Sequence, residues 1–136
     1  GNDGTPGRSL LDLANGDDEP ERVAFSEYHA ARSPSAAYMV RKGRYKYIHY
    51  VGYEPELFDL RADPEEMRDL SSDPAYAEVR AQMYAQLCSM LDPQAVDARA
   101  NAAQKALVES RGGPQAVLAR LVTDKAYRPV PQDLIS

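Results

Sequence analysis

The sequence predicts an α+β fold, with a small antiparallel sheet of about four strands packed on a long helix, then further helices and an extended tail. Residues 22–60 hold four short runs rich in β-branched and aromatic residues, which favour strands. Residues 73–91 carry apolar residues at helical spacing, and proline-led helical segments follow. The chain therefore divides into a connecting loop at 1–20, the sheet and its helix at 21–91, and a helical extension and tail at 92–136.

The connecting loop is rich in glycine, aspartate, asparagine and proline, which favour turns. Its one apolar island, Leu10, Leu11 and Leu13, predicts a single turn that docks on another surface. The chain starts at Gly1 without an initiator methionine. We therefore expect this loop to lead in from a part of the protein that precedes it.

Four strands are predicted in order. The run at 22–29 places Val23, Phe25, Glu27 and His29 on one face, because successive strand residues point to opposite faces. Runs at 37–41 and 44–51 form a hairpin across Lys42-Gly43, where glycine tolerates a positive φ. Both faces of the second arm carry bulky side chains, so one face should meet a helix and the other a different surface. A final strand spans 56–60.

Aspartate-proline pairs mark the turns and helix starts that follow. Asp63-Pro64 predicts a turn able to begin one turn of helix, and Asp73-Pro74 opens a helix to about residue 91. Asp92-Pro93 opens a second helix, which Gly112-Gly113 ends, and Pro114 begins a third that reaches about residue 122.

Two packing predictions concern these helices. The single cysteine, Cys88, lies within the apolar pattern of the first helix, so we expect it to pack as a small hydrophobe. A face of small apolar residues predicts close packing of the second helix; its members are Val96, Ala100, Ala103 and Leu107.

The composition excludes several classes of partner. The chain has 136 residues, 43% of them hydrophobic and 27% charged, and a formal net charge of -5, which is typical of a soluble domain. Nucleic-acid binding needs clustered cations, and a membrane span needs a long apolar run. We expect neither a nucleic-acid nor a membrane partner. The one basic cluster, Arg41, Lys42, Arg44 and Lys46, is interpreted as a solvated edge, with a polyanion site as the alternative.

Catalytic motifs are missing from the chain. It contains no Gly-rich phosphate loop, no paired-cysteine metal pattern, no His-Glu-x-x-His and no Gly-x-Ser-x-Gly. Its two histidines, His29 and His49, are interpreted as structural. Glu27 and His29 share a strand face, where the carboxylate could orient the imidazole or the pair could reach into a neighbouring cleft. Ser26 points the other way, so no nucleophilic triad forms here.

Several motifs in series resemble one family. Residues 38–48 read Tyr-Met-Val-Arg-Lys-Gly-Arg-Tyr-Lys-Tyr-Ile, residues 56–60 read Glu-Leu-Phe-Asp-Leu, and residues 61–70 read Arg-Ala-Asp-Pro-Glu-Glu-Met-Arg-Asp-Leu. In this order they resemble the C-terminal domain of sulfatases of the alkaline-phosphatase-like superfamily, most closely bacterial arylsulfatases and choline-sulfatases. The opening residues 3–11 are similar to the loop that follows the sulfatase catalytic domain.

The resemblance implies a catalytic domain that this chain lacks. Complete sulfatases convert a Cys or Ser of a Cys/Ser-x-Pro-x-Arg motif to formylglycine and hold a divalent cation, usually calcium, and neither motif nor ligand set occurs here. The chain is therefore expected to hold no catalytic residue, no metal and no cofactor, and to be inactive alone. Its expected partner is its own N-terminal catalytic domain, with self-association through an exposed apolar sheet face as a second contact.

The resemblance also suggests a role for one loop. Strand ends of a C-terminal domain often shape substrate entry, so the substrate-pocket rim is predicted at Glu27, His29 and Arg32. Two alternatives stay open: a phosphonate or phosphate monoester hydrolase of the same superfamily, and a non-catalytic protein-interaction module. The expected location is soluble, in a bacterial cytoplasm or periplasm.

Overall fold

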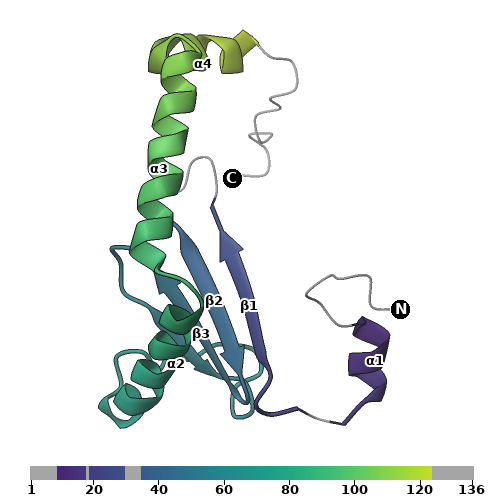
Figure 1. Ribbon diagram of the computed structural model, residues 1–136. Coiled ribbons are helices and arrows are strands. Elements are labelled where there is room, and N and C mark those ends of the chain that lie inside the picture. The colour runs from purple at the N-terminus through teal and green to yellow at the C-terminus, as the bar shows by residue number, and fades with distance from the viewer. Residues whose placement is uncertain (1–8, 18, 30–34, 124–136) are drawn as a thin grey trace, which may run out of the picture.

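The computed structural model describes residues 9–17, 19–29 and 35–123 (Figure 1). It contains one four-stranded antiparallel sheet in the order β1-β2-β3-β4 and several helices, which confirms the α+β prediction. The strands are β1 (Val23–Tyr28), β2 (Ala37–Lys42), β3 (Tyr45–Tyr50) and β4 (Glu56–Asp59). The helices are α1 (Leu10–Asn15), the short 3₁₀ helix η1 (Pro74–Tyr76), α2 (Ala77–Met90), α3 (Pro93–Ser110) and α4 (Gly113–Thr123).

The sheet is a meander because each strand pairs with the next along the chain. The β2–β3 hairpin turns at Gly43, whose φ of 56° lies in the left-handed region that glycine adopts without strain. Tyr47 of β3 faces Val40 on one side and Leu57 on the other. The predicted strands and turn are confirmed to within two residues at each end.

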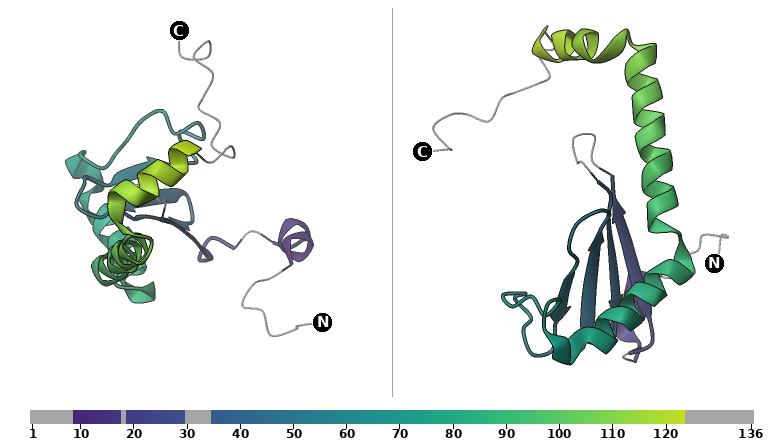
Figure 2. Two further views of the ribbon diagram at one scale, coloured as in Figure 1. Left: turned by 90° about the horizontal axis from the view of Figure 1, so that it is seen from above. Right: turned by 90° about the vertical axis from the view of Figure 1, so that its left-hand side faces the viewer.

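Helix α2 covers one face of the sheet, and the core lies between them (Figures 1 and 2). Met83 and Leu87 of α2 belong to the same buried cluster as the strand residues of this face. These strand residues, each at most 3% exposed, are Tyr38, Val40, Tyr47 and Leu57. We call this side of the sheet the α2 face and the opposite side the open face.

Aspartate side chains cap the helices as predicted. The Asp73 carboxylate accepts a hydrogen bond from the backbone N–H of Ala75 at 3.0 Å, with Pro74 at the first position of η1. The Asp92 carboxylate accepts from the N–H of Ala95 at 3.0 Å, and so caps the start of α3. Each cap satisfies a backbone donor that a helix start leaves unpaired.

The turn predicted at Asp63-Pro64 forms, with the N–H of Glu66 donating to the Asp63 carbonyl at 3.2 Å, but it does not continue into a helix. Residues 61–70 form an irregular loop, in which the Asp63 carboxylate accepts from the N–H of Arg68 at 2.8 Å and Glu66 has a φ of 57°. The Asp69 carboxylate ties the loop back to the sheet by accepting from the N–H of Leu57 at 3.0 Å. Side-chain acceptors for these N–H groups compete with a helix here.

Helices α3 and α4 form an arm that projects from the sheet, with α4 crossing the far end of α3 (Figures 1 and 2). The arm is anchored at its base, where the buried Pro93 carbonyl accepts from the Tyr38 hydroxyl at 3.3 Å and Asp97 accepts from the N–H of Ala36 at 2.8 Å. The predicted small packing face is wrong beyond its first turns, because Ala103 and Leu107 are exposed.

Cys88 is also exposed, so its predicted packing in the core is wrong. The residue next to it, Leu87, faces the sheet, and one step along an α-helix turns a side chain by about 100°. The short helix α1 forms where the docking turn was predicted. The predicted tail at 124–136 lies outside the described residues. Among the helices that the structure describes, none has the length and apolar character needed to span a membrane.

Candidate functional site

Glu27 and His29 lie together at the end of β1, on the α2 face. His29 Nε2 is 3.6 Å from Glu27 Oε2, and the two side chains are 26% and 49% exposed. The imidazole also meets the ring of Tyr38 edge-on, with the ring centroids 5.6 Å apart. The structure therefore brings together two of the three predicted rim residues. The third, Arg32, lies outside the described residues.

Tyr38 links this pair to the base of the arm. Burial raises the pKa of the Tyr38 phenol, and the nearby carboxylates of Asp97 and Glu27 raise it further. The phenol therefore stays neutral and donates to the Pro93 carbonyl. Because Tyr38 fixes one side of the His29 ring, the Glu27–His29 pair has a defined orientation at the sheet end nearest α3. Ser26 lies on the open face, so the predicted separation of Ser26 from this pair is confirmed.

His49 lies between the sheet and α2. Its ring centroid is 5.2 Å from that of Tyr84 and 6.4 Å from that of Tyr47. Its Nε2 atom is buried and, in the described part of the chain, finds no hydrogen-bond partner. Burial lowers the pKa of His49, so the imidazole is neutral at pH 7. This environment is that of a core residue, in line with the structural role predicted for it.

The basic cluster on the hairpin is largely paired with carboxylates. Lys42 contacts Glu21 at 2.9 Å, and Lys46 contacts Glu66 at 2.5 Å. Arg44 forms a two-point ion pair with the buried Asp59. These pairs use charge that a polyanion would need, so they favour the solvated-edge interpretation over a polyanion site.

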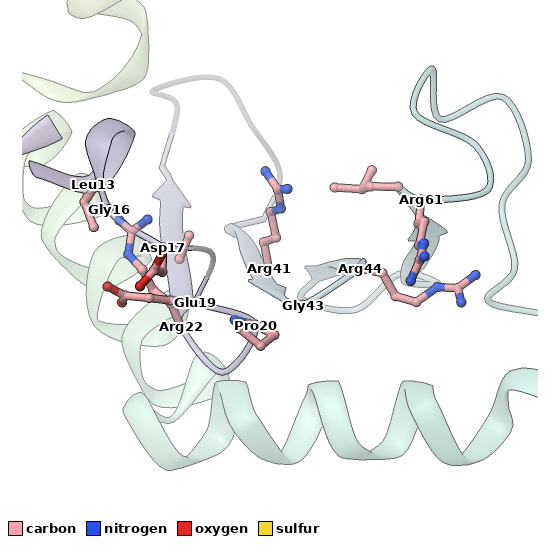
Figure 3. Close-up of a pocket in the computed structure, with 12 residues that line it drawn as sticks. Leu13, Gly16, Asp17, Glu19, Pro20, Arg22, Arg41, Gly43, Arg44 and Arg61 are labelled. Atoms are coloured by element: carbon pink, nitrogen blue, oxygen red, sulfur yellow. The ribbon is translucent and has the colours of Figure 1, made fainter. Parts of the chain in front are cut away.

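An open depression of about 880 Å³ lies beside this cluster, between the hairpin and the segment after α1 (Figure 3). Its wall mixes arginines with the acidic residues Asp17 and Glu19. Figure 3 shows the side chains of Arg41 and Arg44 running in different directions. The depression therefore lacks a set of groups that converge on one point, which a specific ligand site needs. Across the described residues, no three His, Cys, Asp or Glu side chains are placed to hold a metal ion.

The acidic residues of the quoted motifs build the domain itself. The Arg44 guanidinium beside Asp59 holds the pKa of that carboxyl below its usual value, although burial opposes this, and the backbone N–H groups of Arg61 and Ala62 add to the effect. Burial also opposes ionisation of Asp69, but N–H groups of Leu57 and Ser71 lower its pKa. Both carboxylates hold the end of β4 and the loop after it. The acidic residues of these motifs therefore have a structural role.

Residues 3–92 match the family model described as N-sulphoglucosamine sulphohydrolase, C-terminal. The chain belongs to this family. The match spans the connecting loop, the sheet and α2, and ends where α3 begins. This confirms the resemblance to a sulfatase C-terminal domain.

Relatives of this sulfatase C-terminal domain are much longer proteins. This chain is 35% identical over 82 residues to the multifunctional alkaline phosphatase superfamily protein PehA of Trinickia caryophylli, and the match covers 60% of this chain and 14% of that protein. It is 41% identical over 71 residues to a choline-sulfatase of Rhizobium meliloti, covering 52% of this chain and 14% of the relative. A solved 2-O GAG sulfatase matches with a TM-score of 0.51 and 33% identity, over 62% of this chain and 19% of that chain.

Sequence reasoning missed one feature of this sulfatase C-terminal domain, which is the contact of Tyr38 with the base of α3. Tyr38 and Pro93 are separated by 55 positions. The only sequence signal was a bulky residue on a strand face beside Glu27 and His29. Neither its depth nor its partner on α3 follows from spacing alone.

Proposed function

We propose that the whole protein to which this chain belongs hydrolyses sulfate esters, and that this chain is its C-terminal domain. The family match over residues 3–92 carries the proposal. Two relatives named as sulfatases share 33% and 41% identity with the chain over the matched region. The chain spans less than a fifth of the length of these relatives. In this proposal, the catalytic groups belong to a part of the protein that precedes the chain.

The chemistry would be supplied by that preceding part. The proposed groups are a formylglycine, made from a Cys or Ser, and a divalent cation such as calcium, as the family resemblance implies. Such a cation stabilises the charge on the sulfuryl oxygens. The acidic residues with lowered pKa in this chain, Asp59 and Asp69, are bonded to an arginine and to backbone N–H groups. They are therefore committed to the fold.

The rim proposal concerns Glu27, His29 and Arg32. A half-exposed carboxylate repels a sulfate group, so Glu27 suits the alcohol portion of an ester, where it can accept from a hydroxyl or contact a cation. His29 is held between Glu27 and Tyr38 and can donate or accept with little rearrangement. Arg32 is the one cation proposed for the rim. Together they would affect substrate choice, not the reacting sulfur.

Hydrolysis of 4-nitrophenyl sulfate by the full-length protein tests the proposed reaction directly. Sulfate release above the uncatalysed rate supports it, and a folded full-length protein without that activity refutes it. The variants Glu27→Gln and His29→Gln test the rim, with Glu78→Gln on the outer surface of α2 as the matched control. For a sulfate ester whose alcohol portion carries free hydroxyl groups, we expect KM to rise by about tenfold at the rim, equivalent to one lost hydrogen bond, and to stay constant for the control. An unchanged KM for both rim variants would remove them from the pocket.

A second candidate reaction is hydrolysis of phosphonate or phosphate monoesters. It is favoured by one observation, the similarity to PehA, which is named as a multifunctional member of the alkaline phosphatase superfamily. Sulfate and phosphate esters place similar demands of shape and charge on a site. Parallel assays with 4-nitrophenyl phosphate and phenyl phosphonate esters decide between them through the ratio of kcat/KM values.

A further inference from the structure

The open face of the sheet carries an ordered pattern of side chains. Strand register places Tyr28, Ala37 and Tyr50 side by side at the end nearest α3. The next row holds Ser26, Met39, Ile48 and, on β4, Glu56. The row nearest the β2–β3 turn holds Ala24, Arg41 and Lys46, followed on β4 by Phe58. The first row and the centre of the second are therefore aromatic or aliphatic, Ser26 and Glu56 lie at the two ends of the second row, and the third row is basic.

This face is only partly covered by the described residues. Tyr28 is 64% exposed, Ser26 and Arg41 are exposed, and Met39, Ile48 and Tyr50 are half-buried. Among the described helices, α2 packs on the opposite face, and α3 is anchored on that side as well (Figure 2). The corner at Phe58 is closed, where Glu66 of the 61–70 loop reaches across to Lys46. Leu13 of α1 and the segment after it border the face at Ala24 and Arg41, where they line the depression described above. A contiguous apolar patch of this kind marks a protein contact.

We propose that the open face packs against the catalytic domain that precedes this chain, so that the sheet lies between that domain and α2. The inference rests on the proposed function for the identity of the occupant. Since the matched family is a C-terminal one and the chain spans 19% of the solved relative, the proposed function places most of the whole protein before residue 1. The chain enters the sheet through β1, an edge strand that contributes Ser26 and Tyr28 to this face.

The pattern also fixes the chemistry of the partner surface. The apolar centre of the first two rows requires an apolar counterpart, because burying Met39 and Ile48 against polar groups would leave those groups unsatisfied. Arg41 is exposed and, within the described residues, makes no ion pair, whereas its neighbour Lys46 is bonded to Glu66. The catalytic domain should therefore present a carboxylate opposite Arg41.

Thiol labelling tests which face is covered. The variants are made in a Cys88→Ser background: Ser26→Cys lies on the open face and Ala81→Cys on the outer side of α2. Each variant is alkylated both in this chain and in the full-length protein, and mass spectrometry follows the labelling of each site. We expect alkylation at position 26 to be at least about tenfold slower in the full-length protein than in this chain, and the alkylation rate at position 81 to be nearly the same in both. Equal rates at position 26 in the two proteins would overturn the proposal, as would protection already present in this chain alone.

Charge reversal gives a second test. Arg41→Glu should lower the thermal midpoint of the full-length protein and leave that of this chain unchanged, because the carboxylate that it would repel belongs to the catalytic domain. Equal shifts in both proteins would contradict that docking. Neither measurement depends on turnover, so a docked protein without sulfatase activity would refute the proposed function alone, and an active protein with a freely labelled open face would refute the docking alone.

Discussion

Replacing Leu87 with alanine should cost the domain a large part of its stability. Leu87 projects from α2 into the core and is 0% exposed. Removing three carbon groups loses about 2.4 kcal/mol at roughly 0.8 kcal/mol for each. The cavity left behind raises the expected loss to about 3–5 kcal/mol, as in other buried leucine-to-alanine changes. Since roughly 1 kcal/mol shifts the melting midpoint of a 136-residue chain by about 3–4 °C, the midpoint should fall by about 10 °C or more.

Leu107→Ala is the matched control for this variant. Leu107 lies on α3 and is 50% exposed, so the same change should cost about 1 kcal/mol or less. Thermal unfolding followed by circular dichroism compares the two variants with the parent chain. If Leu87→Ala lowers the midpoint no more than Leu107→Ala does, α2 does not cover the sheet and the assignment of the two faces is wrong.

Two further predictions concern the hairpin and its ion pair. Arg44 lowers the pKa of Asp59 in the folded state, so the ionised carboxylate stabilises the fold. This stabilisation is fully present above the unfolded pKa of about 4 and is lost as the pH falls through the folded pKa. Asp59→Asn should therefore lower the thermal midpoint at pH 7 and make the midpoint fall less steeply in acid. The exposed control Glu65→Gln should follow the parent. Parallel acid profiles for Asp59→Asn and the parent would contradict this reasoning. Gly43→Val should cost about 1–3 kcal/mol at its positive φ, and Gly43→Asn clearly less, because asparagine tolerates that region; equal denaturant midpoints for the two would show that the turn is not strained.

The parts of the fold that were predictable depend on local rules. The Lys42-Gly43 turn and the caps at Asp73 and Asp92 follow from the conformational preferences of a few neighbouring residues, and all three are confirmed. The wrong predictions are those that depend on how one helix or strand packs against another. The apolar periodicity of α2 includes Cys88, but periodicity does not give the width of the helix face that the sheet covers. Cys88 lies outside that covered face and is exposed.

The arm shows the same limit. Small residues along α3 permit close packing, but they cannot supply a partner, and α3 leaves the sheet after its first turns, so Ala103 is exposed. At the candidate site, the spacing of Glu27 and His29 predicted a shared face, and the structure confirms a contact. The orientation of that pair comes from Tyr38 on the neighbouring strand, through a cross-strand register that sequence alone left open.

The coding sequence upstream of Gly1 tests the central claim, that this chain is the C-terminal domain of a sulfate-ester hydrolase, most directly. The account predicts a Cys/Ser-x-Pro-x-Arg motif there, together with neighbouring acidic residues that can hold a divalent cation. A stop codon directly before this chain, or an unrelated domain in that place, would contradict the account and leave the domain as a scaffold used without its sulfatase partner.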